Sequence, residues 1–454
     1  MFQTIPKEEQ PVLEHLLNIR ARLSVIKRDR RSYLKLEDIM PLRLEIEDQM
    51  KALSALRGGH LIDESRELNR TDDVLDEILQ ILSLCFLSLG KTRESPSVYA
   101  QVVAIKHIFD RLNEAGVYEE EYLQPYKAKL DEIEKILNHD RKHRILPEHV
   151  MQVLQYKFAQ CRKIYEKLIN TLRKVDTELI PILERMLRIR RSLGTVCCKR
   201  DYTPEDIRPL QDEIQEIDNA RVGGKFIGPD GSIPKGQEIL NSLLEKLHYW
   251  SHDIVLACSD DFSPALQDVR ERLLKIKNHL ERLELTHKWT LRQTDLFTYQ
   301  HQLHDIVQLK YNYKDQEGHI NPKLMGKFVD NKGVAPEGQI VLEFLLHKCY
   351  RMIFVLLSES VPVSEALTPV YNQLTSVRQC LLAVKNINAP CSIEELYPYQ
   401  MKLSSIDDMR KDGKFYDDTG NIPEGQGLCV DILEECYNIL GSLKDQSENN
   451  TSSP

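Results

Sequence analysis

The chain carries one fourteen-residue pattern three times: Gly224-Lys225-Phe226-Ile227-Gly228-Pro229-Asp230-Gly231-Ser232-Ile233-Pro234-Lys235-Gly236-Gln237, and its counterparts at 326–339 and 413–426. Seven positions are identical in all copies, in the form GKF-x4-G-x2-P-x-G-Q. Identities at fixed spacing indicate internal duplication, and duplicated segments are the usual sign of a repeat protein.

A second pattern extends the repeat to the whole chain. It reads [ILF]-x-P-[LY] and occurs around Pro41, Pro125, Pro209 and Pro398, with Thr298 in place of the proline in one copy. We interpret these anchors as five units, of which the first two lack the GKF loop. The predicted boundaries are 1–95, 96–174, 175–260, 261–360 and 361–444, followed by a polar tail, 445–454, that we expect to be disordered.

Each unit is predicted to contain three α-helices. In the third unit, Thr203 and Pro204 are typical of a helix start, Gly223-Gly224 is expected to end that helix, and Pro234 is expected to begin the next one. A unit of this kind cannot bury its apolar stripes alone, so neighbouring units must cover them. The sequence predicts an all-α fold of tandem helical-bundle repeats in an elongated, solenoid-like stack; separate bundles that share long helices are the alternative.

The GKF loop itself is interpreted first as a structural element, with a tight turn at Gly231 and a phenylalanine that fills the gap between two helices. A nucleotide-binding P-loop needs a preceding strand and a Ser or Thr after the lysine, and neither is present. The alternative is a shared ligand or peptide site built from the repeated loops. Its candidate residues are Lys225, Phe226, Lys327, Phe328, Lys414 and Phe415.

Composition restricts the function classes. The 454 residues carry 61 Lys and Arg against 70 Asp and Glu, a net charge of −9, so nothing drives the whole chain toward nucleic acid or an anionic membrane. Basic clusters nevertheless occur in the first 200 residues, where we expect mostly solvated helix faces. The candidate basic patch consists of Arg185, Arg188, Arg190, Arg191, Lys199 and Arg200.

No catalytic, metal or cofactor motif is found, so the sequence predicts neither an enzyme nor a bound cofactor. His248 and His252 have the spacing of zinc ligands but lack a metalloprotease motif, and we interpret them as structural. The chain shows no signal-peptide pattern and no apolar run long enough for a membrane span. Ten cysteines without a CxxC pair are typical of a reducing compartment, which predicts a cytoplasmic and nuclear location.

The GKF loops and their flanking proline-anchored helices resemble an uncharacterised fungal protein family, a domain of unknown function, over roughly residues 10 to 440. This resemblance implies a mostly helical protein and transfers no catalytic residue. The leading hypothesis is a non-enzymatic scaffold or adaptor for protein partners of unknown identity. A nucleic-acid or phosphoinositide adaptor that uses the basic helix faces, and an enzyme with a site between bundles, are the alternatives.

Overall fold

The structure is a computed structural model. It describes residues 5–59, 61–62, 68–115, 118, 120–172, 174–199, 201–228, 231–258, 263–287, 291–311, 324, 326–330, 333–387 and 392–451.

The fold is all α-helical, as predicted. In the described ranges the only β-type pairing is two isolated bridges, Val222–Lys225 and Lys411–Lys414. The described α-helices follow the five predicted intervals in groups of three, except that α4 begins one residue before the second interval and α15 runs seven residues past the fifth. They are α1 (Gln10–Arg28), α2 (Leu36–Leu56), α3 (Arg70–Ser88), α4 (Ser95–Ala115), α5 (Glu120–His143), α6 (Glu148–Leu172), α7 (Ile180–Cys197), α8 (Pro204–Asn219), α9 (Gln237–Leu256), α10 (Pro264–Arg282), α11 (Leu296–Leu309), α12 (Gln339–Ser358), α13 (Thr368–Ile387), α14 (Ile393–Asp407) and α15 (Gln426–Thr451).

The anchor prolines occupy one position in these helices. Pro41, Pro125, Pro209 and Pro398 are each the sixth residue of α2, α5, α8 and α14. Thr298 is likewise the sixth residue from Gln293, where a 3₁₀ turn leads into α11. A proline here removes one hydrogen bond close to the helix start and leaves the rest of the ladder intact. The division into five homologous units stays a prediction, and this shared register is consistent with it.

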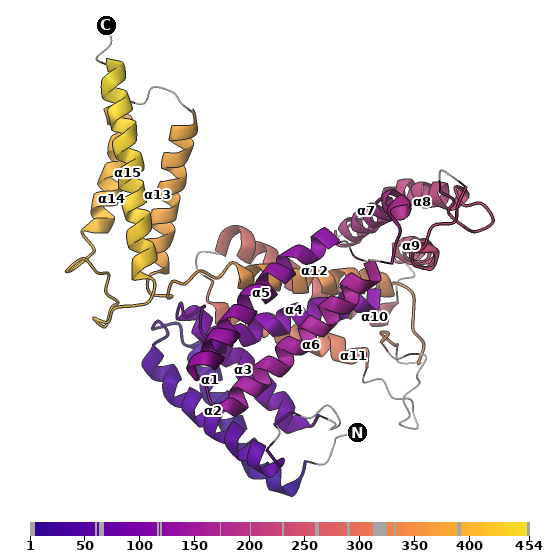
Figure 1. Cartoon of the computed structure of the whole chain (residues 1–454), viewed down its shortest axis with the longest axis horizontal. Coiled ribbons are helices and arrows are strands. Elements are labelled where there is room, and N and C mark those ends of the chain that lie inside the picture. Colours follow the sequence, from indigo (N-terminus) through magenta and orange to yellow (C-terminus); the bar gives the residue numbers. More distant parts are fainter. Residues whose placement is uncertain are drawn as a thin grey trace.

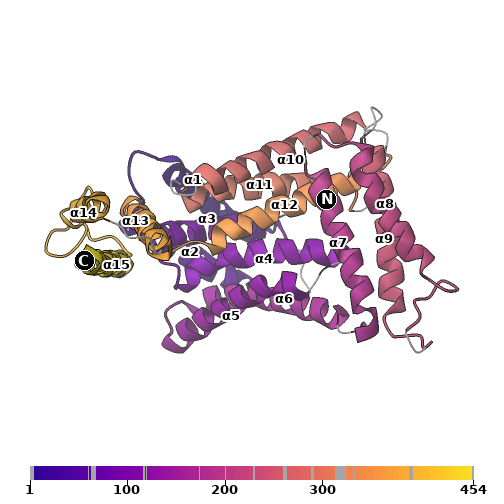
Figure 2. The same cartoon turned by 90° about the horizontal axis from the view of Figure 1, so that it is seen from above.

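Helices α1 to α12 form one body with a continuous apolar core (Figures 1 and 2). Helix α12 lies at its centre and packs against α4 as well as α7, α9, α10 and α11. Its buried residues include Leu345, Leu346 and Ile353. The α12–α4 contact joins the fourth interval directly to the second, which a stack of strictly sequential neighbours would not do.

Helices α13 to α15 form a second bundle that projects from the body (Figures 1 and 2). Its apolar residues, among them Leu374, Leu403 and Leu433, form a core of their own. Glu365, just before α13, ties this bundle to the body. Its carboxylate accepts from the buried Arg292 guanidinium at 2.8 and 2.7 Å, and its amide donates to the carbonyl of Ser88 at 3.0 Å.

The structure differs from the sequence expectations at several helix ends. The third helices begin at Gln237, Gln339 and Gln426, three residues after the prolines, because a glycine in the left-handed conformation precedes each of them. Gly425 is one of these glycines (φ +105°), and an added Cβ there would lie 2.8 Å from Cα of Val363.

Two more ends differ. Helix α8 ends at Asn219, and Gly223-Gly224 form the tight turn of the Val222–Lys225 bridge instead of a helix cap, because their φ angles of +59° and +76° suit such a turn. The polar tail continues α15 to Thr451, since adding residues to an existing helix is far cheaper than starting one. Among the described helices, none is both long and apolar enough to cross a bilayer.

Candidate functional site

Each GKF loop is closed by its last residue, the glutamine that begins the third helix. The side chain of Gln237 accepts from the amide of Phe226 at 2.9 Å and donates to the carbonyl of the same residue at 2.7 Å. It also donates to the carbonyl of Pro234 at 3.2 Å. Gln339 and Gln426 make the same three bonds in their own loops, at 2.8 to 3.2 Å. We call this arrangement the glutamine clasp.

The clasp explains the roles of the loop positions that are identical in all three copies. Phe226, Phe328 and Phe415 are each 2% exposed; the first two belong to the core of the body and Phe415 to the core of the second bundle. Lys225, Lys327 and Lys414 are exposed, and each lies on a different inter-helix loop. The α8–α9 and α14–α15 connections lie at opposite ends of the molecule (Figures 1 and 2). The three loops therefore do not converge on one site, and the phenylalanines are buried where a ligand would need them exposed.

A basic cleft of about 590 Å³ lies between the start of α5 and helices α7, α10 and α12. Six cationic side chains line it against two carboxylates, in a chain whose net charge is −9. The cations are Arg190, Arg191, Lys199, Lys277, Lys348 and Arg351, and the carboxylates are Glu121 and Glu281. A volume of this size is typical of small-molecule sites.

Helix α7 forms one wall because of its periodicity. Leu187, Arg190, Arg191, Gly194, Thr195 and Cys198 follow one another at i, i+3, i+4, i+7, i+8 and i+11, and all line the cleft. Gly194 lets α7 approach α12 closely, since an added Cβ would lie 2.9 Å from the ring of Phe344.

The structure divides the candidate basic patch. Arg190, Arg191 and Lys199 line the cleft. Arg185 points toward α8, where it pairs with Glu213 at 2.8 Å and Glu216 at 2.6 Å. Arg188 is exposed outside the cleft. Arg200 lies outside the described residues.

An aromatic pair forms the inner surface of the cleft. The Tyr122 hydroxyl and Nε2 of His347 are 2.8 Å apart. Burial, followed by the charges of Arg190, Arg351 and Arg111, lowers the pKa of His347 to about 3. The imidazole is therefore neutral at physiological pH and accepts the hydrogen bond from Tyr122. The Arg351 guanidinium lies 5.5 Å from the centroid of the Tyr122 ring.

Sequence reasoning missed half of the cations. Lys277, Lys348 and Arg351 come from α10 and α12, and the packing of α12 against both α7 and α10 brings them to Arg191 and Lys199. Lys277 is partly neutralised by Glu281 at 3.2 Å. The only sequence signal for these cations was a charged residue, such as Lys348, next to the almost wholly apolar stripe of α12. The structure shows that Lys348 is half-buried.

Three arginines of α1 and of the segment that follows it pair with carboxylates. Arg20 contacts Glu77 at 2.7 Å, Arg22 contacts Glu45 at 2.5 Å, and Arg30 contacts Asp295. These exposed pairs lower the positive potential of the α1 surface. The face of α1 therefore offers less to an anionic partner than the cleft does.

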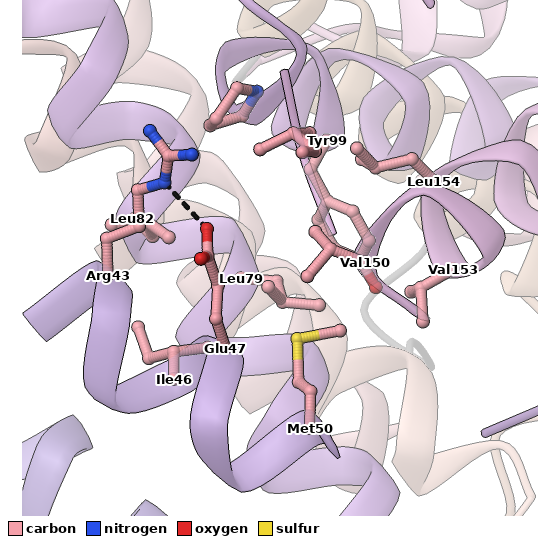
Figure 3. Close-up of a pocket in the computed structure, with 12 residues that line it drawn as sticks. Arg43, Ile46, Glu47, Met50, Leu79, Leu82, Tyr99, Val150, Val153 and Leu154 are labelled. Atoms are coloured by element: carbon pink, nitrogen blue, oxygen red, sulfur yellow. Dashed lines mark hydrogen bonds and ion pairs between the residues drawn. The ribbon is translucent and has the colours of Figure 1, made fainter. Parts of the chain in front are cut away.

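A smaller cavity of about 30 Å³ lies between α2, α3, α4 and α6 (Figure 3). Its walls are mainly apolar, with Met50, Leu79 and Val150 among them, and an Arg43–Glu47 ion pair of 2.8 Å lies at one side. This volume corresponds to about one water molecule. The cavity is too small for an organic ligand.

The histidine pair on α9 lies next to a carboxylate of α8. His248 Nε2 lies 3.3 Å from Asp218 of α8. Within the described ranges, no three His, Cys, Asp or Glu side chains are grouped so that they could hold a metal ion.

Comparison with known proteins gives the family. A family model described as "Protein of unknown function (DUF2408)" matches residues 172–293 and 361–454. A Schizosaccharomyces pombe protein named "CUB1 family protein C30C2.08" is 34% identical over 98% of this chain and 94% of its own length. The chain belongs to the CUB1 family. Another relative of this CUB1-family chain, "Cu(2+) suppressing and bleomycin sensitive protein 1" of Saccharomyces cerevisiae, is 33% identical over 99% of the chain and 93% of the relative.

These matches confirm the resemblance to a fungal family. Each segment of the CUB1-family chain that the family model matches contains one GKF loop, 224–237 or 413–426. No solved structure matches the chain significantly.

Proposed function

We propose that this CUB1-family protein is a non-enzymatic binding protein that holds a phosphate-bearing ligand in the basic cleft. The observation that carries the proposal is the excess of six cations over two carboxylates in one concave site of an acidic protein. Like charges gathered in a hollow with low-dielectric walls attract an oppositely charged ligand more strongly than the same charges on a flat surface.

The side chains of the cleft suit phosphate. Arg191 and Arg351 can each offer two parallel N–H donors to phosphate oxygens, and Lys199 and Lys348 add mobile point charges. The rings of Tyr118, Tyr122 and Phe344 line the same space and provide an apolar surface for the remainder of a ligand.

Binding without catalysis fits the hydrogen-bonded pair of His347 and Tyr122 in the cleft. A general acid or base works best when its pKa lies near the operating pH. His347 has a pKa of about 3 and is hydrogen-bonded to Tyr122, whose own pKa burial raises above its ordinary value. Neither group can exchange a proton readily near neutral pH.

The test is calorimetric titration of the full chain with inositol hexakisphosphate and with inorganic tripolyphosphate, at 50 and 200 mM salt. We expect saturable binding that weakens steeply with salt. The double variant Lys348→Glu/Arg351→Glu should weaken it at least tenfold. The matched control, Arg141→Glu/Lys142→Glu, makes the same charge change at the exposed end of α5 and should bind like the parent. Equal binding by both variants, or no binding at 50 mM salt, would overturn the proposal.

A protein scaffold is the second candidate, and helix α14 favours it. Ile393, Tyr397 and Met401 lie at i, i+4 and i+8 on this helix and are each more than half exposed. The stripe fits the apolar face of an amphipathic partner helix. A purified partner should bind the parent chain and lose affinity for Tyr397→Glu/Met401→Glu while still binding Lys402→Glu. Undiminished binding by the first variant would rule the stripe out.

A cytoplasmic or nuclear location goes with this proposal. The nine cysteines within the described ranges are all free thiols, which suits a reducing compartment.

A further inference from the structure

Two histidines near the end of α5 form a pair outside the basic cleft. His139 and His143 are one helical turn apart, and both side chains are exposed. Their ring centroids lie 4.5 Å apart, with an angle of 45° between the ring planes. Apart from this contact, neither imidazole forms a hydrogen bond or an ion pair with a residue in the described part of the chain. Their ring nitrogens are therefore available to a ligand from solution.

The separation of the two rings is that of imidazoles bound to one metal ion. A metal about 2.0–2.1 Å from an imidazole nitrogen lies about 3.2 Å from the centroid of that ring. Two imidazoles that bind the same ion at a right angle then have centroids about 4.5 Å apart, which is the separation found for His139 and His143. A tetrahedral angle would place the centroids about 5.2 Å apart. The geometry therefore favours an ion with square-planar or octahedral coordination.

The position of the pair on the helix also suits a cation. Histidines at i and i+4 share one face of a helix, which is the spacing used by helical zinc-binding histidines. Helix α5 ends at His143, and the free carbonyls of a last helical turn carry partial negative charge. Lys135 and Lys142 flank the pair and oppose a divalent cation. All four side chains are exposed, so water and salt screen this repulsion.

A second histidine pair with the same spacing has a different geometry. His248 and His252 lie at i and i+4 on α9. Nε2 of His248 is 3.3 Å from the carboxylate of Asp218, and the two rings make no contact with each other in the described structure. Sequence spacing alone therefore does not distinguish the two pairs, whereas the contact between the rings selects the pair on α5.

We propose that His139 and His143 bind one divalent transition-metal ion of the Ni²⁺ and Cu²⁺ class. Imidazole nitrogens suit these ions, and both ions accept right-angle coordination. Water fills the remaining coordination positions, because no group of three metal-ligating side chains forms in the described ranges. His139 lies about 25 Å from Tyr122 along the axis of α5. The site is therefore separate from the basic cleft and does not depend on the function proposed for it.

The test is calorimetric titration of the full chain, without an affinity tag, with Ni²⁺ at pH 7.5. Ni²⁺ is the probe because soft thiols of the chain, such as the exposed Cys380, would compete for copper. We expect saturable binding with a stoichiometry of one. The double variant His139→Gln/His143→Gln should weaken it at least tenfold. The matched control, His248→Gln/His252→Gln, removes two histidines at the same spacing and should bind Ni²⁺ like the parent.

Four results would overturn the proposal. The parent chain could fail to bind Ni²⁺, or the His139→Gln/His143→Gln variant could bind it as tightly as the parent does. Weaker binding in the α9 control would assign the ion to His248 and His252. Tighter binding of Zn²⁺ than of Ni²⁺ through the α5 pair would contradict the right-angle geometry. Circular dichroism verifies the folding of each variant, and His143→Asn alone replaces the double variant should that variant fail to fold.

Discussion

A single side chain stabilises each repeated loop through the glutamine clasp. One side chain satisfies both backbone groups of a buried phenylalanine across eleven positions of sequence. A leucine at the same position would have similar bulk but could neither donate nor accept. The clasp therefore predicts a specific, local loss of stability when the amide is removed.

We expect Gln426→Leu to destabilise the α13–α15 bundle by about 1–3 kcal/mol, the usual cost of leaving a buried polar group without its partner. Hydrogen exchange at the Phe415 amide should be faster than in the parent chain. The exchange rates in α13 should change less. Gln215→Leu, on the exposed face of α8, is the control and should leave exchange unaltered. Unchanged protection of Phe415 in Gln426→Leu would contradict a stabilising role for the clasp.

Buried histidines make stability depend on pH. The pKa of His347 is lowered from 6.5 to about 3, so the unfolded chain binds more protons than the folded chain between these values. The free energy of unfolding must then rise with pH in this window and fall as the solution is acidified from pH 6.5 toward 3. His107, buried against Tyr350 with a pKa of about 4, acts in the same direction.

We expect His347→Gln to reduce this slope by up to about 1.4 kcal/mol per pH unit between pH 6 and 4, the value for one proton. Urea unfolding at pH 7, 6, 5 and 4 measures it. The exposed His143→Gln serves as the comparison and should retain the parental slope. Parallel curves for His347→Gln and the parent would refute the assignment of a neutral buried imidazole.

At the scale of elements, a buried ion cluster joins the N-terminal 3₁₀ turn (Lys7–Glu9) to the end of α2 and the start of α3. The Arg57 guanidinium donates to both carboxylate oxygens of Glu9 at 2.9 Å and to Asp72 at 2.7 Å. Asn69, which caps α3, also donates to Glu9 at 2.9 Å. Glu9 and Arg57 side chains are each 5% exposed, so solvent screens them little.

Glu9→Ala should lower the free energy of unfolding by about 3–5 kcal/mol. The reason is that the buried Arg57 charge keeps only one of its two carboxylate partners, Asp72. Urea unfolding followed by far-ultraviolet circular dichroism measures the loss. The double variant Glu9→Leu/Arg57→Met removes both charges and should be more stable than Glu9→Ala. If it is less stable, the stabilisation comes from the pair itself and not from avoiding an unmatched charge.

The sequence predicted the elements better than their spatial arrangement. Apolar periodicity and start signals such as Thr203-Pro204 gave three helices in each interval, because these are local properties of the chain. Start positions were wrong by three residues where a left-handed glycine, such as Gly425, places the helix start after the proline. Such a placement depends on the close approach of Val363, which is remote in sequence.

The candidate sites show the same limit. Arg190, Arg191 and Lys199 were found because they lie close together in sequence. Lys348 and Arg351 were not, since only the packing of α12 on α7 brings them to the cleft.

For the whole molecule, the two cores predict two folding units. Residues 359–451 contain α13 to α15 and nearly all of the second core. This fragment alone should be helical and unfold cooperatively on heating, as measured by circular dichroism. The fragment 264–358, nearly equal in length, contains α10 to α12 but loses the α4 surface that covers α12, and should aggregate or remain unfolded. A folded, monomeric 264–358 fragment would contradict the view of helices α1 to α12 as one body.

The α12–α4 contact has a consequence for synthesis on the ribosome. The last residue of α12 is made 243 positions after the last residue of α4, which takes about 12–50 seconds at typical elongation rates. Throughout that interval, the surface of α4 that α12 will cover has no native partner. The apolar surface of α4 therefore stays exposed on the nascent chain during this time. A chaperone that binds exposed apolar surfaces would be needed most before residue 358 is translated.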